Sequence, residues 1–210
     1  MTQPRASARR DEITRAAAAE FDEVGYAAAS LSSIAARLGK TKGAMSYHFS
    51  SKASLAREVV EAQYRQWEDV LSGIRTDGYS GLDAMILLAF AVAQRFRDDV
   101  LVRAGIRLQH DAGLHGVDLP TPFVSWMSVT RDLLAEANAN GELQPVLDLE
   151  GAAEVLVEAF TGVQQVAHRL TRAQDIHGRV QRYWTLMLPG LGVTDPVERV
   201  ARLAQQSEAY

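Results

Sequence analysis

The chain has 210 residues, of which 47% are hydrophobic and 23% are charged, a composition typical of globular proteins. It contains no cysteine, which excludes a disulfide framework, thiolate chemistry and zinc sites of the cysteine type. The net charge of −4 is uneven, because residues 1–57 carry nine Lys/Arg and five Asp/Glu, whereas residues 58–210 carry thirteen and twenty-one. A basic first part suits a protein that presents one end to phosphate groups, although chance clustering of charge explains the numbers equally well.

The first third of the chain predicts three helices and the start of a fourth. A first helix, ending near Gly25, is indicated by apolar residues at helical spacing: Ile13, Ala17, Phe21 and Val24. Ser30 is placed to cap a second helix, which Gly39 ends. The core face of this second helix consists of Leu31, Ile34, Ala35 and Leu38. Thr41 then caps a third helix that ends near Phe49, and a long fourth helix starts at Ser50 or Ser51.

The fourth helix keeps one face apolar up to the break at residues 76–81. Further helices are predicted at about 81–97 and 99–110, followed by a glycine-rich loop at 111–120. Thr121-Pro122 suits a helix start, and that helix runs to about Asn140. Two long helices at roughly 149–172 and 175–189 and a short one after Pro196 complete the chain. No segment alternates with period two, so the predicted fold class is all-α.

The segment from Ser30 to Phe49 predicts a helix-turn-helix, two short helices joined by a tight turn that contains Gly39. On the second of these helices Met45 and Phe49 share the inward face, so Tyr47 faces outward. Residues at the start of such a helix contact base edges, while their neighbours hold phosphates. A plain helical hairpin in a bundle is the structural alternative. The residues expected at DNA are Ser32, Thr41, Lys42, Gly43, Ala44, Ser46, Tyr47, His48 and Lys52.

The stretch LSSIAARLGKTKGAMSYHFSSKASL, residues 31–55, resembles the DNA-binding signature of the TetR family of repressors. The matching elements are the Leu-x-x-Ile-Ala segment, Gly39, Thr41-Lys42-Gly43, the Tyr47-His48-Phe49 run, Lys52 with Leu55, and the upstream Gly25-Tyr26. The chain departs from the family at Met45-Ser46, where a Leu-Tyr pair is usual. The resemblance implies a TetR-like fold, with a DNA-binding domain at residues 1–52 and a ligand-binding and dimerisation domain at 53–210.

Four segments resemble the γ-butyrolactone-type autoregulator receptors of actinomycetes, a branch of that family. They are the TKGAxxxHF form of the third helix, GYS-x-L at 78–82, VRAGIRLQ at 102–109 and LPTPFVSW at 119–126. The resemblance implies a homodimeric repressor that binds a pseudo-palindromic operator. It also implies release by a small hydrophobic effector of the γ-butyrolactone, butenolide or furan type, with control of secondary metabolism.

In that branch a tryptophan after the proline-rich loop lines the effector pocket, and Trp126 matches it. An apolar effector with a few oxygens needs an apolar site with a few fixed polar groups. The residues expected at the effector are Trp126, Thr161, Gln63, Trp67, Met85, Phe90, Phe123 and Gln164. For Thr161 the structural alternative is a hydrogen bond to its own helix, and for Trp126 a place in the core.

The last two long helices have wide apolar faces, and the resemblance implies that they form a four-helix interface with a second subunit. One apolar stripe consists of Ile176, Val180, Tyr183, Trp184 and Met187. A symmetric dimer would place its two third helices at the two halves of the operator.

Two other function classes compete with an autoregulator receptor. A TetR-like multidrug sensor that represses an efflux pump would share the DNA-binding head but have a larger aromatic pocket. A helical enzyme is less favoured, because the chain has no Gly-x-Ser-x-Gly, phosphate-binding loop or dinucleotide fingerprint. His110, His115, His168 and His177 are scattered, and no pair has the local acidic context of a metal site. His110, Asp111 and His115 are close in sequence, but in a glycine-rich loop they are expected to face solvent. No cofactor, metal or catalytic residue is therefore expected.

A secretory signal peptide and a membrane span are also not expected. No apolar segment follows the basic start MTQPRASARR, although a signal peptide requires one. The longest apolar run, from Met85 to Ala93, is too short to cross a bilayer. We therefore expect a cytoplasmic protein.

Overall fold

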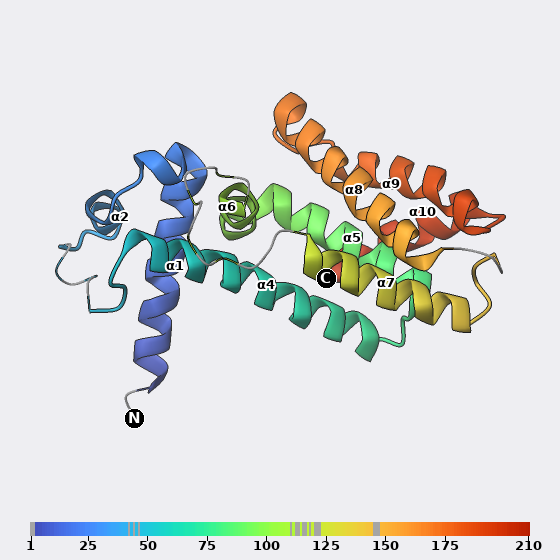
Figure 1. The fold of residues 1–210 in the computed structure, drawn as a ribbon, viewed down its shortest axis with the longest axis horizontal. Helices are drawn as coiled ribbons and strands as arrows, with labels where there is room; N and C mark the ends of the chain where they lie inside the picture. Colours follow the sequence, from blue (N-terminus) through green and yellow to red (C-terminus); the bar gives the residue numbers. More distant parts are fainter. Residues whose placement is uncertain are drawn as a thin grey trace. The chain divides into compact units, whose positions relative to one another are not determined.

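The computed structural model describes residues 3–41, 43, 45, 47–109, 111, 114, 117, 119, 123–144 and 148–210 (Figure 1). The expectations for Lys42, Ala44 and Ser46, and for a helix start at Thr121-Pro122, lie outside these residues. Every regular element in the described part is helical, which confirms the predicted all-α class. The helices form two compact units, each built from two separate stretches of the chain.

Unit 1 consists of residues Met1–Gln66 and Asp99–Pro122. Its described helices are α1 (Gln3–Ala28), α2 (Leu31–Arg37), the first part of α4 (Lys52–Thr76) and α6 (Val100–Gln109). Helix α6 packs along α1, and α2 packs on α1 as well. The core of unit 1 is formed by apolar side chains from all four helices, including Phe21, Ile34, Val59 and Leu108.

The start of α2 confirms the predicted cap. The Ser30 side chain accepts a hydrogen bond from the backbone of Ser33 at 3.0 Å, and the Ser33 hydroxyl oxygen accepts one from the Ser30 backbone. This reciprocal pair satisfies two backbone donors at the helix start. Gly39 follows α2 with a φ of 61°, a left-handed conformation that glycine adopts without steric cost. Both ends of α2 are therefore determined by local sequence.

Helix α1 agrees with expectation in one respect and departs from it in another. Its first helical stretch ends at the non-helical Gly25, with φ 81°, and a short continuation beyond this kink reaches Ala28. Val24, expected on the core face with Ile13 and Phe21, is 42% exposed, whereas Ile13 and Phe21 are 2% and 0% exposed. The prediction for Val24 was wrong, because periodicity identifies a helix face but not how far along the helix the packing partner extends.

Unit 2 consists of residues Trp67–Asp98 and Phe123–Tyr210. It contains the rest of α4, with α5 (Gly81–Asp98), α7 (Val124–Ala139), α8 (Leu149–Thr171), α9 (Ile176–Met187) and α10 (Pro196–Gln206). A short 3₁₀ helix, η2 (Leu188–Leu191), lies between α9 and α10, and another, η3 (Ser207–Ala209), follows α10. Helix α5 is apolar on nearly all sides and packs against α7, α9 and α10, so it forms the centre of the unit (Figure 1).

The apolar stripe of α9 lies in the core of unit 2. Ile176, Val180 and Trp184 are at most 2% exposed, and the Tyr183 hydroxyl donates to the Leu156 carbonyl at 2.7 Å. Large apolar side chains that stay exposed on α8 and α9 are Val155, Val166, Leu170 and Leu186. The residues of these helices that are available to a partner are therefore different from the stripe singled out in the sequence.

The division of the chain into these two compact units does not correspond to a single boundary between residues 52 and 53. Helix α6 belongs with α1, and α4 contributes its first part to unit 1 and its last part to unit 2. Packing of α6 on α1 explains the difference, since sequence order alone does not reveal such a long-range contact. Within the described residues, no helix combines the length and hydropathy that a bilayer crossing needs.

Candidate nucleic-acid interface and effector site

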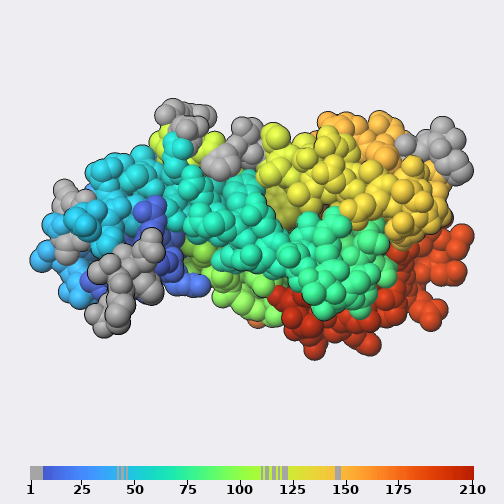
Figure 2. Space-filling model, turned by 90° about the horizontal axis from the view of Figure 1, so that it is seen from below, coloured from blue at the N-terminus to red at the C-terminus, as the bar shows by residue number. Residues whose placement is uncertain are grey.

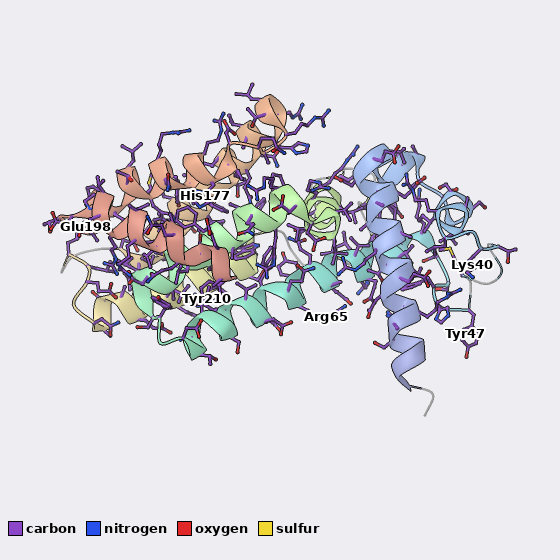
Figure 3. The ribbon with its side chains drawn as sticks, turned by 180° about the vertical axis from the view of Figure 1, so that it is seen from behind. Lys40, Tyr47, Arg65, His177, Glu198 and Tyr210 are labelled. Atoms are coloured by element: carbon purple, nitrogen blue, oxygen red, sulfur yellow. The ribbon has the colours of Figure 1, made fainter. Side chains whose placement is uncertain are left out.

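The stretch predicted as the third helix, residues 41–49, is called the third-helix segment below. Its described residues divide into an inward and an outward set, as predicted. Met45 and Phe49 are 1% and 3% exposed, and both belong to the core of unit 1. Tyr47 between them is 90% exposed, and its side chain extends away from α1, as does that of Lys40 (Figure 3). Ser32, Thr41 and Gly43 are exposed as well. This segment thus presents hydroxyl groups and a glycine to the outside while it is anchored by two apolar side chains.

His48 is half-buried and packs against Tyr47, with the two ring centroids 5.3 Å apart in a T-shaped arrangement. The backbone N–H groups of His48 and Phe49 both donate to the Met45 carbonyl, at 2.9 and 3.0 Å. These bonds close the turn after the segment. An aromatic hydroxyl and an imidazole N–H beside each other are suitable donors to phosphate oxygens.

Lys52 occupies a different position from the one expected for a phosphate ligand. Its ammonium group donates to the carbonyl oxygens of Tyr26 at 2.7 Å, Ala29 at 2.9 Å and Ala27 at 3.3 Å. It also lies 4.3 Å from the centroid of the Tyr26 ring. An ammonium group has three donors, and all three are used here. Lys52 therefore holds the carbonyl end of α1, and we do not carry it into the set of proposed DNA contacts.

Helix α2 is held on α1 by a carboxylate that the sequence analysis did not single out. Arg37 of α2 forms ion pairs with Glu20 and Glu23 of α1. Hydrogen bonds from Ser33 and Arg37 lower the pKa of Glu20 below its ordinary value, despite partial burial that acts in the opposite direction. Glu20 therefore stays charged at neutral pH and fixes the first helix of the helix-turn-helix.

A second ion cluster joins α1 and α4. Arg10 of α1 donates through Nε to Glu58 Oε2 at 3.0 Å, and Arg65 donates to Glu58 Oε1 at 2.8 Å. The Arg10 guanidinium also lies 4.7 Å from the centroid of the Phe49 ring. The Glu58 side chain is only 9% exposed. Burial acts to raise the pKa of Glu58, but the two arginines outweigh it, and the pKa is lowered.

Two residues of the expected effector set lie side by side in unit 2. The rings of Trp67 on α4 and Trp126 on α7 are 5.7 Å apart between centroids. Trp67 is 5% exposed, and its indole Nε1 has no acceptor among the described residues. A buried donor without a partner costs about 1–3 kcal/mol. An acceptor atom supplied by a bound molecule would remove that cost.

The remaining members of the expected effector set are dispersed. Met85 and Phe90 are buried on α5, and the Phe90 ring packs on His177 with centroids 4.8 Å apart. The Thr161 hydroxyl donates to the Val157 carbonyl of its own helix at 2.8 Å, which is the structural alternative considered for it. Phe123 precedes α7 in a left-handed conformation with φ 68°. Gln164 is 7% exposed on α8.

Gln63 lies in unit 1, on the part of α4 that packs near α6. It is 1% exposed, and its Oε1 has no donor among the described residues. Its side chain fills the space where a Cβ atom would stand on Gly105 of α6. The glycine thus permits a close approach of Gln63 to the α6 backbone.

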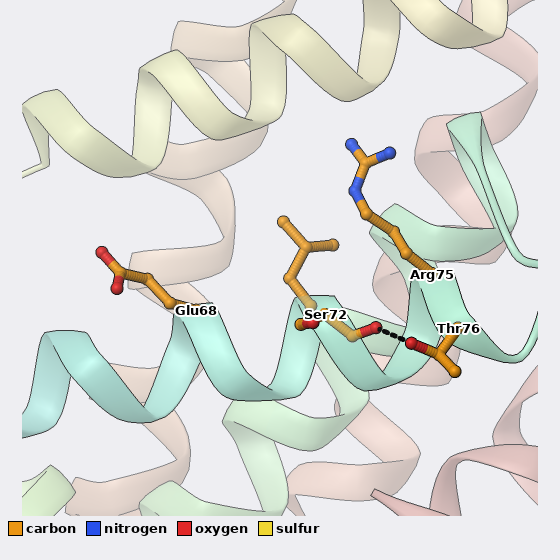
Figure 4. A pocket seen from close by; sticks show the side chains of 5 residues that line it. Glu68, Ser72, Arg75 and Thr76 are labelled. Carbon is orange, nitrogen blue, oxygen red and sulfur yellow. Dashed lines mark hydrogen bonds between the residues drawn. The ribbon is translucent and has the colours of Figure 1, made fainter.

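An open groove of about 500 Å³ lies elsewhere on unit 2 and is lined by Glu68, Leu71, Ser72, Arg75 and Thr76 of α4 (Figure 4). Arg75 forms an ion pair with Glu136 of α7, so the last turns of α4 run beside α7, as the surface in Figure 2 also shows. None of the lining residues belongs to the expected effector set. In the described part of the chain no cluster of histidines and carboxylates could hold a metal ion.

Comparison with protein families gives two matches that together span most of the chain. Residues 13–59 match the model described as bacterial regulatory proteins, tetR family. Residues 79–193 match the model described as tetracyclin repressor-like, C-terminal domain. The first match contains α2 and the third-helix segment, and the second contains α5 to α9.

Individual proteins that are similar to this chain are described as a receptor for A-factor, a γ-butyrolactone receptor and a TetR family protein. The A-factor receptor protein of Streptomyces griseus is 32% identical over 181 residues, which are 85% of this chain and 62% of that relative. A γ-butyrolactone receptor structure, described as ArpA-like, is 32% identical with a TM-score of 0.80, covering 96% of this chain and 99% of that one. CprB of Streptomyces coelicolor, solved with its operator sequence, is 32% identical with a TM-score of 0.74, covering 98% and 97%.

Proposed function

The chain belongs to the TetR family of bacterial regulatory proteins, and from this premise we propose that it is a dimeric, effector-released transcriptional repressor of the γ-butyrolactone-receptor branch. It binds a pseudo-palindromic operator through unit 1 and a small hydrophobic signalling molecule through unit 2. By this proposal it controls secondary metabolism. A repressor acts where its operator is, so the proposed location is the cytoplasm.

The observation that carries the proposed DNA binding is the exposure pattern of the third-helix segment. Tyr47 is 90% exposed between two side chains that are almost completely buried, Met45 and Phe49. A rigidly anchored turn with an exposed phenol is suited to approach a DNA groove closely, and Ser32 and Thr41 are exposed as well. The similar proteins support the proposal, since one of them is described in complex with its operator.

The proposed dimer uses the outer faces of α8 and α9. The exposed apolar side chains Val155, Val166, Leu170 and Leu186 all lie on these two helices. Apolar groups gathered in this way are typical of a surface that a second subunit covers. A two-fold axis through such an interface would relate two copies of unit 1, as a pseudo-palindromic operator requires.

The proposed effector site is built around Trp67 and Trp126. The two indole rings, inclined by 55° to each other, offer apolar surface, and the buried Nε1 of Trp67 supplies one donor that lacks an acceptor among the described residues. A lactone or furan-type effector has an alkyl chain and carbonyl or ring oxygens. Its chain would pack on the rings, and one oxygen would accept the indole proton.

Helix α4 is the proposed route of the response. It carries Trp67 in unit 2 and Glu58 in unit 1 on one continuous helix. An effector that binds one arrangement of α4 better than another would shift the population of operator-competent molecules. The shift is limited by the difference in effector affinity between the two arrangements.

The test is a fluorescence-anisotropy titration of the purified protein on DNA from upstream of its own gene, with and without an organic extract of the producing culture. The proposal predicts tight, salt-sensitive binding that the extract abolishes. Operator binding that no extract affects would contradict only the proposed release by an effector. Equal affinity for the upstream DNA and a scrambled duplex would contradict the repressor itself.

A further inference from the structure

We propose that Arg10 is a positioning residue for operator binding, which sets the third-helix segment against α4 without itself contacting DNA. This inference rests on the proposed DNA binding of unit 1. Arg10 is the point at which α1, α4 and the end of the third-helix segment meet, through its contacts with Glu58 and Phe49.

The contacts of Arg10 differ in kind from those of the adjacent Arg9. Arg9 pairs with Glu12 on the same helix at 2.8 Å, and both side chains are largely exposed, at 37% and 47%. The Arg10 side chain is itself 49% exposed, but it reaches residue 58, far along the chain, and its partner carboxylate is 9% exposed. Exposed pairs of the first kind contribute about 0–1 kcal/mol, whereas charge-assisted bonds to a shielded carboxylate are stronger.

Phe49 makes this geometry relevant to DNA recognition. It closes the segment that holds Tyr47, since its N–H donates to the Met45 carbonyl, and its ring is 3% exposed. The Arg10 guanidinium stands over that ring at 4.7 Å while Glu58 holds the same group from α4. A cation over an aromatic face is favourable, and a planar guanidinium can stack and donate at once. The ring and the α4 carboxylate are thereby held at a fixed separation.

Both carboxylate oxygens of Glu58 take part in this arrangement. Its Oε2 accepts from Arg10 and its Oε1 from Arg65. If Arg10 were instead a phosphate ligand, the adjacent Glu58 carboxylate would offset the charge of the guanidinium, and Glu58 would oppose DNA binding. If Arg10 is a positioning residue, Glu58 supports DNA binding. The two roles therefore predict opposite effects of neutralising Glu58.

The experiment compares Arg10→Ala, Glu58→Gln, the double variant and the control Arg9→Ala with the unaltered protein. Affinity for the upstream DNA and for a scrambled duplex is measured over a range of salt concentrations. We expect Arg10→Ala and Glu58→Gln each to weaken operator binding by roughly tenfold, about 1.4 kcal/mol. Binding to the scrambled duplex and the salt slope should stay unchanged, because no phosphate contact is lost. The double variant should be no weaker than either single one.

A second measurement does not depend on DNA. Amide hydrogen exchange of the free protein should be faster at His48 and Phe49 in Arg10→Ala, and unchanged in Arg9→Ala. The amide of Leu38, at the end of α2, serves as the internal reference.

The proposal is overturned if Glu58→Gln strengthens operator binding, or if Arg10→Ala lowers the salt slope by about 0.9, the value for one phosphate. It is also overturned if both variants bind like the unaltered protein. If the unaltered protein does not prefer the upstream DNA, the proposed function fails instead. The exchange rates at His48 and Phe49 then still decide whether Arg10 positions the segment.

Discussion

The Nζ atom of Lys52 lies 2.7 Å from the carbonyl oxygen of Tyr26 and 4.3 Å from the centroid of the Tyr26 ring. One residue thus receives both a charge-assisted hydrogen bond and a cation–π contact from the first residue of α4. The carbonyls of Ala27 and Ala29 accept from the same ammonium group. Carbonyls at a helix C-terminus carry partial negative charge, so a cation there is favourable. This arrangement joins the start of α4 to the end of α1.

Replacing Lys52 with Met is expected to destabilise the protein by roughly 1.5–3 kcal/mol, the range for hydrogen bonds to charged groups. The methionine keeps most of the apolar stem but leaves the carbonyls of Tyr26 and Ala29 without their donor. Urea unfolding followed by circular dichroism measures the change. Lys40→Met, at an exposed position, is the matched control. If Lys52→Met were no less stable than the control Lys40→Met, the role assigned to Lys52 would be contradicted.

Replacing Tyr47 with Phe is expected to lower operator affinity by roughly two- to tenfold, the value of one hydrogen bond to a phosphate oxygen. The melting temperature should not change, because the side chain is 90% exposed and its ring contact with His48 is retained. Anisotropy titrations and thermal melts of the same preparations provide both values. Tyr79→Phe, in unit 2, is the control. Unchanged affinity would remove the Tyr47 hydroxyl from the proposed interface.

Replacing Trp126 with Ala is expected to leave operator binding intact and to abolish release by the organic extract. The side chain contacts Trp67, and both residues belong to unit 2, so its loss removes a wall of the proposed effector site. The measurement is the operator anisotropy signal as extract is added. Val124→Ala changes a 58% exposed residue of the same helix and should respond like the unaltered protein. Normal release from the Trp126 variant would refute this site.

Replacing Gly105 with Ala is expected to destabilise the protein by about 1–3 kcal/mol through overpacking. The new Cβ would stand 3.1 Å from the Cβ of Gln63 and still closer to its amide. This clash outweighs the gain of up to about 1 kcal/mol that alanine gives in a helix. In a double-mutant cycle, adding Gln63→Ala should recover part of the loss, because the amide is removed. Strictly additive effects would show that the two residues do not meet.

The lowered pKa of Glu58 predicts a pH-dependent contribution to stability. Burial opposes its ionisation, but hydrogen bonds from Arg10 and Arg65 dominate, so the folded-state pKa lies below the ordinary 4.5. The contribution is therefore fully present above about pH 4.5 and is lost as the pH falls through the folded-state pKa. Glu61 and Asp11, the other acidic groups near Arg10, remain in both proteins compared.

Urea unfolding of the unaltered protein and of Glu58→Gln at pH 7 and at stepwise lower pH measures this contribution. The difference in free energy of unfolding between them should be largest at pH 7 and shrink on acidification. A difference that stays constant with pH would mean that the charge on Glu58 does not stabilise the fold.

Local sequence was sufficient for the ends and inward faces of the helices of unit 1. Ser30 and Gly39 act through bonds and backbone angles within a few residues, so their roles could be predicted. Met45 and Phe49 follow from helical spacing in the same way. Val24 could not be placed, since its exposure depends on where other helices stop.

Contacts between residues far apart in the chain could not be predicted. Arg10 and Glu58 are 48 positions apart, and nothing in either neighbourhood indicates the other. Lys52 was assigned to phosphate on charge alone, because its partners are backbone carbonyls, which no side-chain pattern reveals. The stripe of Ile176 and Val180 on α9 likewise gave no indication whether it faces the core of its own unit or a partner.

The division of unit 1 between two stretches of chain has a consequence for its biosynthesis. Leu101, Ala104 and Leu108 of α6 belong to the same core as Ile13 and Phe21 of α1. A nascent chain that has emerged from the ribosome only through α4 therefore lacks one wall of that core. Since domains emerge from the N-terminus and fold as units, the DNA-binding unit can reach its final packing only after α6 is synthesised. Translation through α5, which belongs to the other unit, must come first.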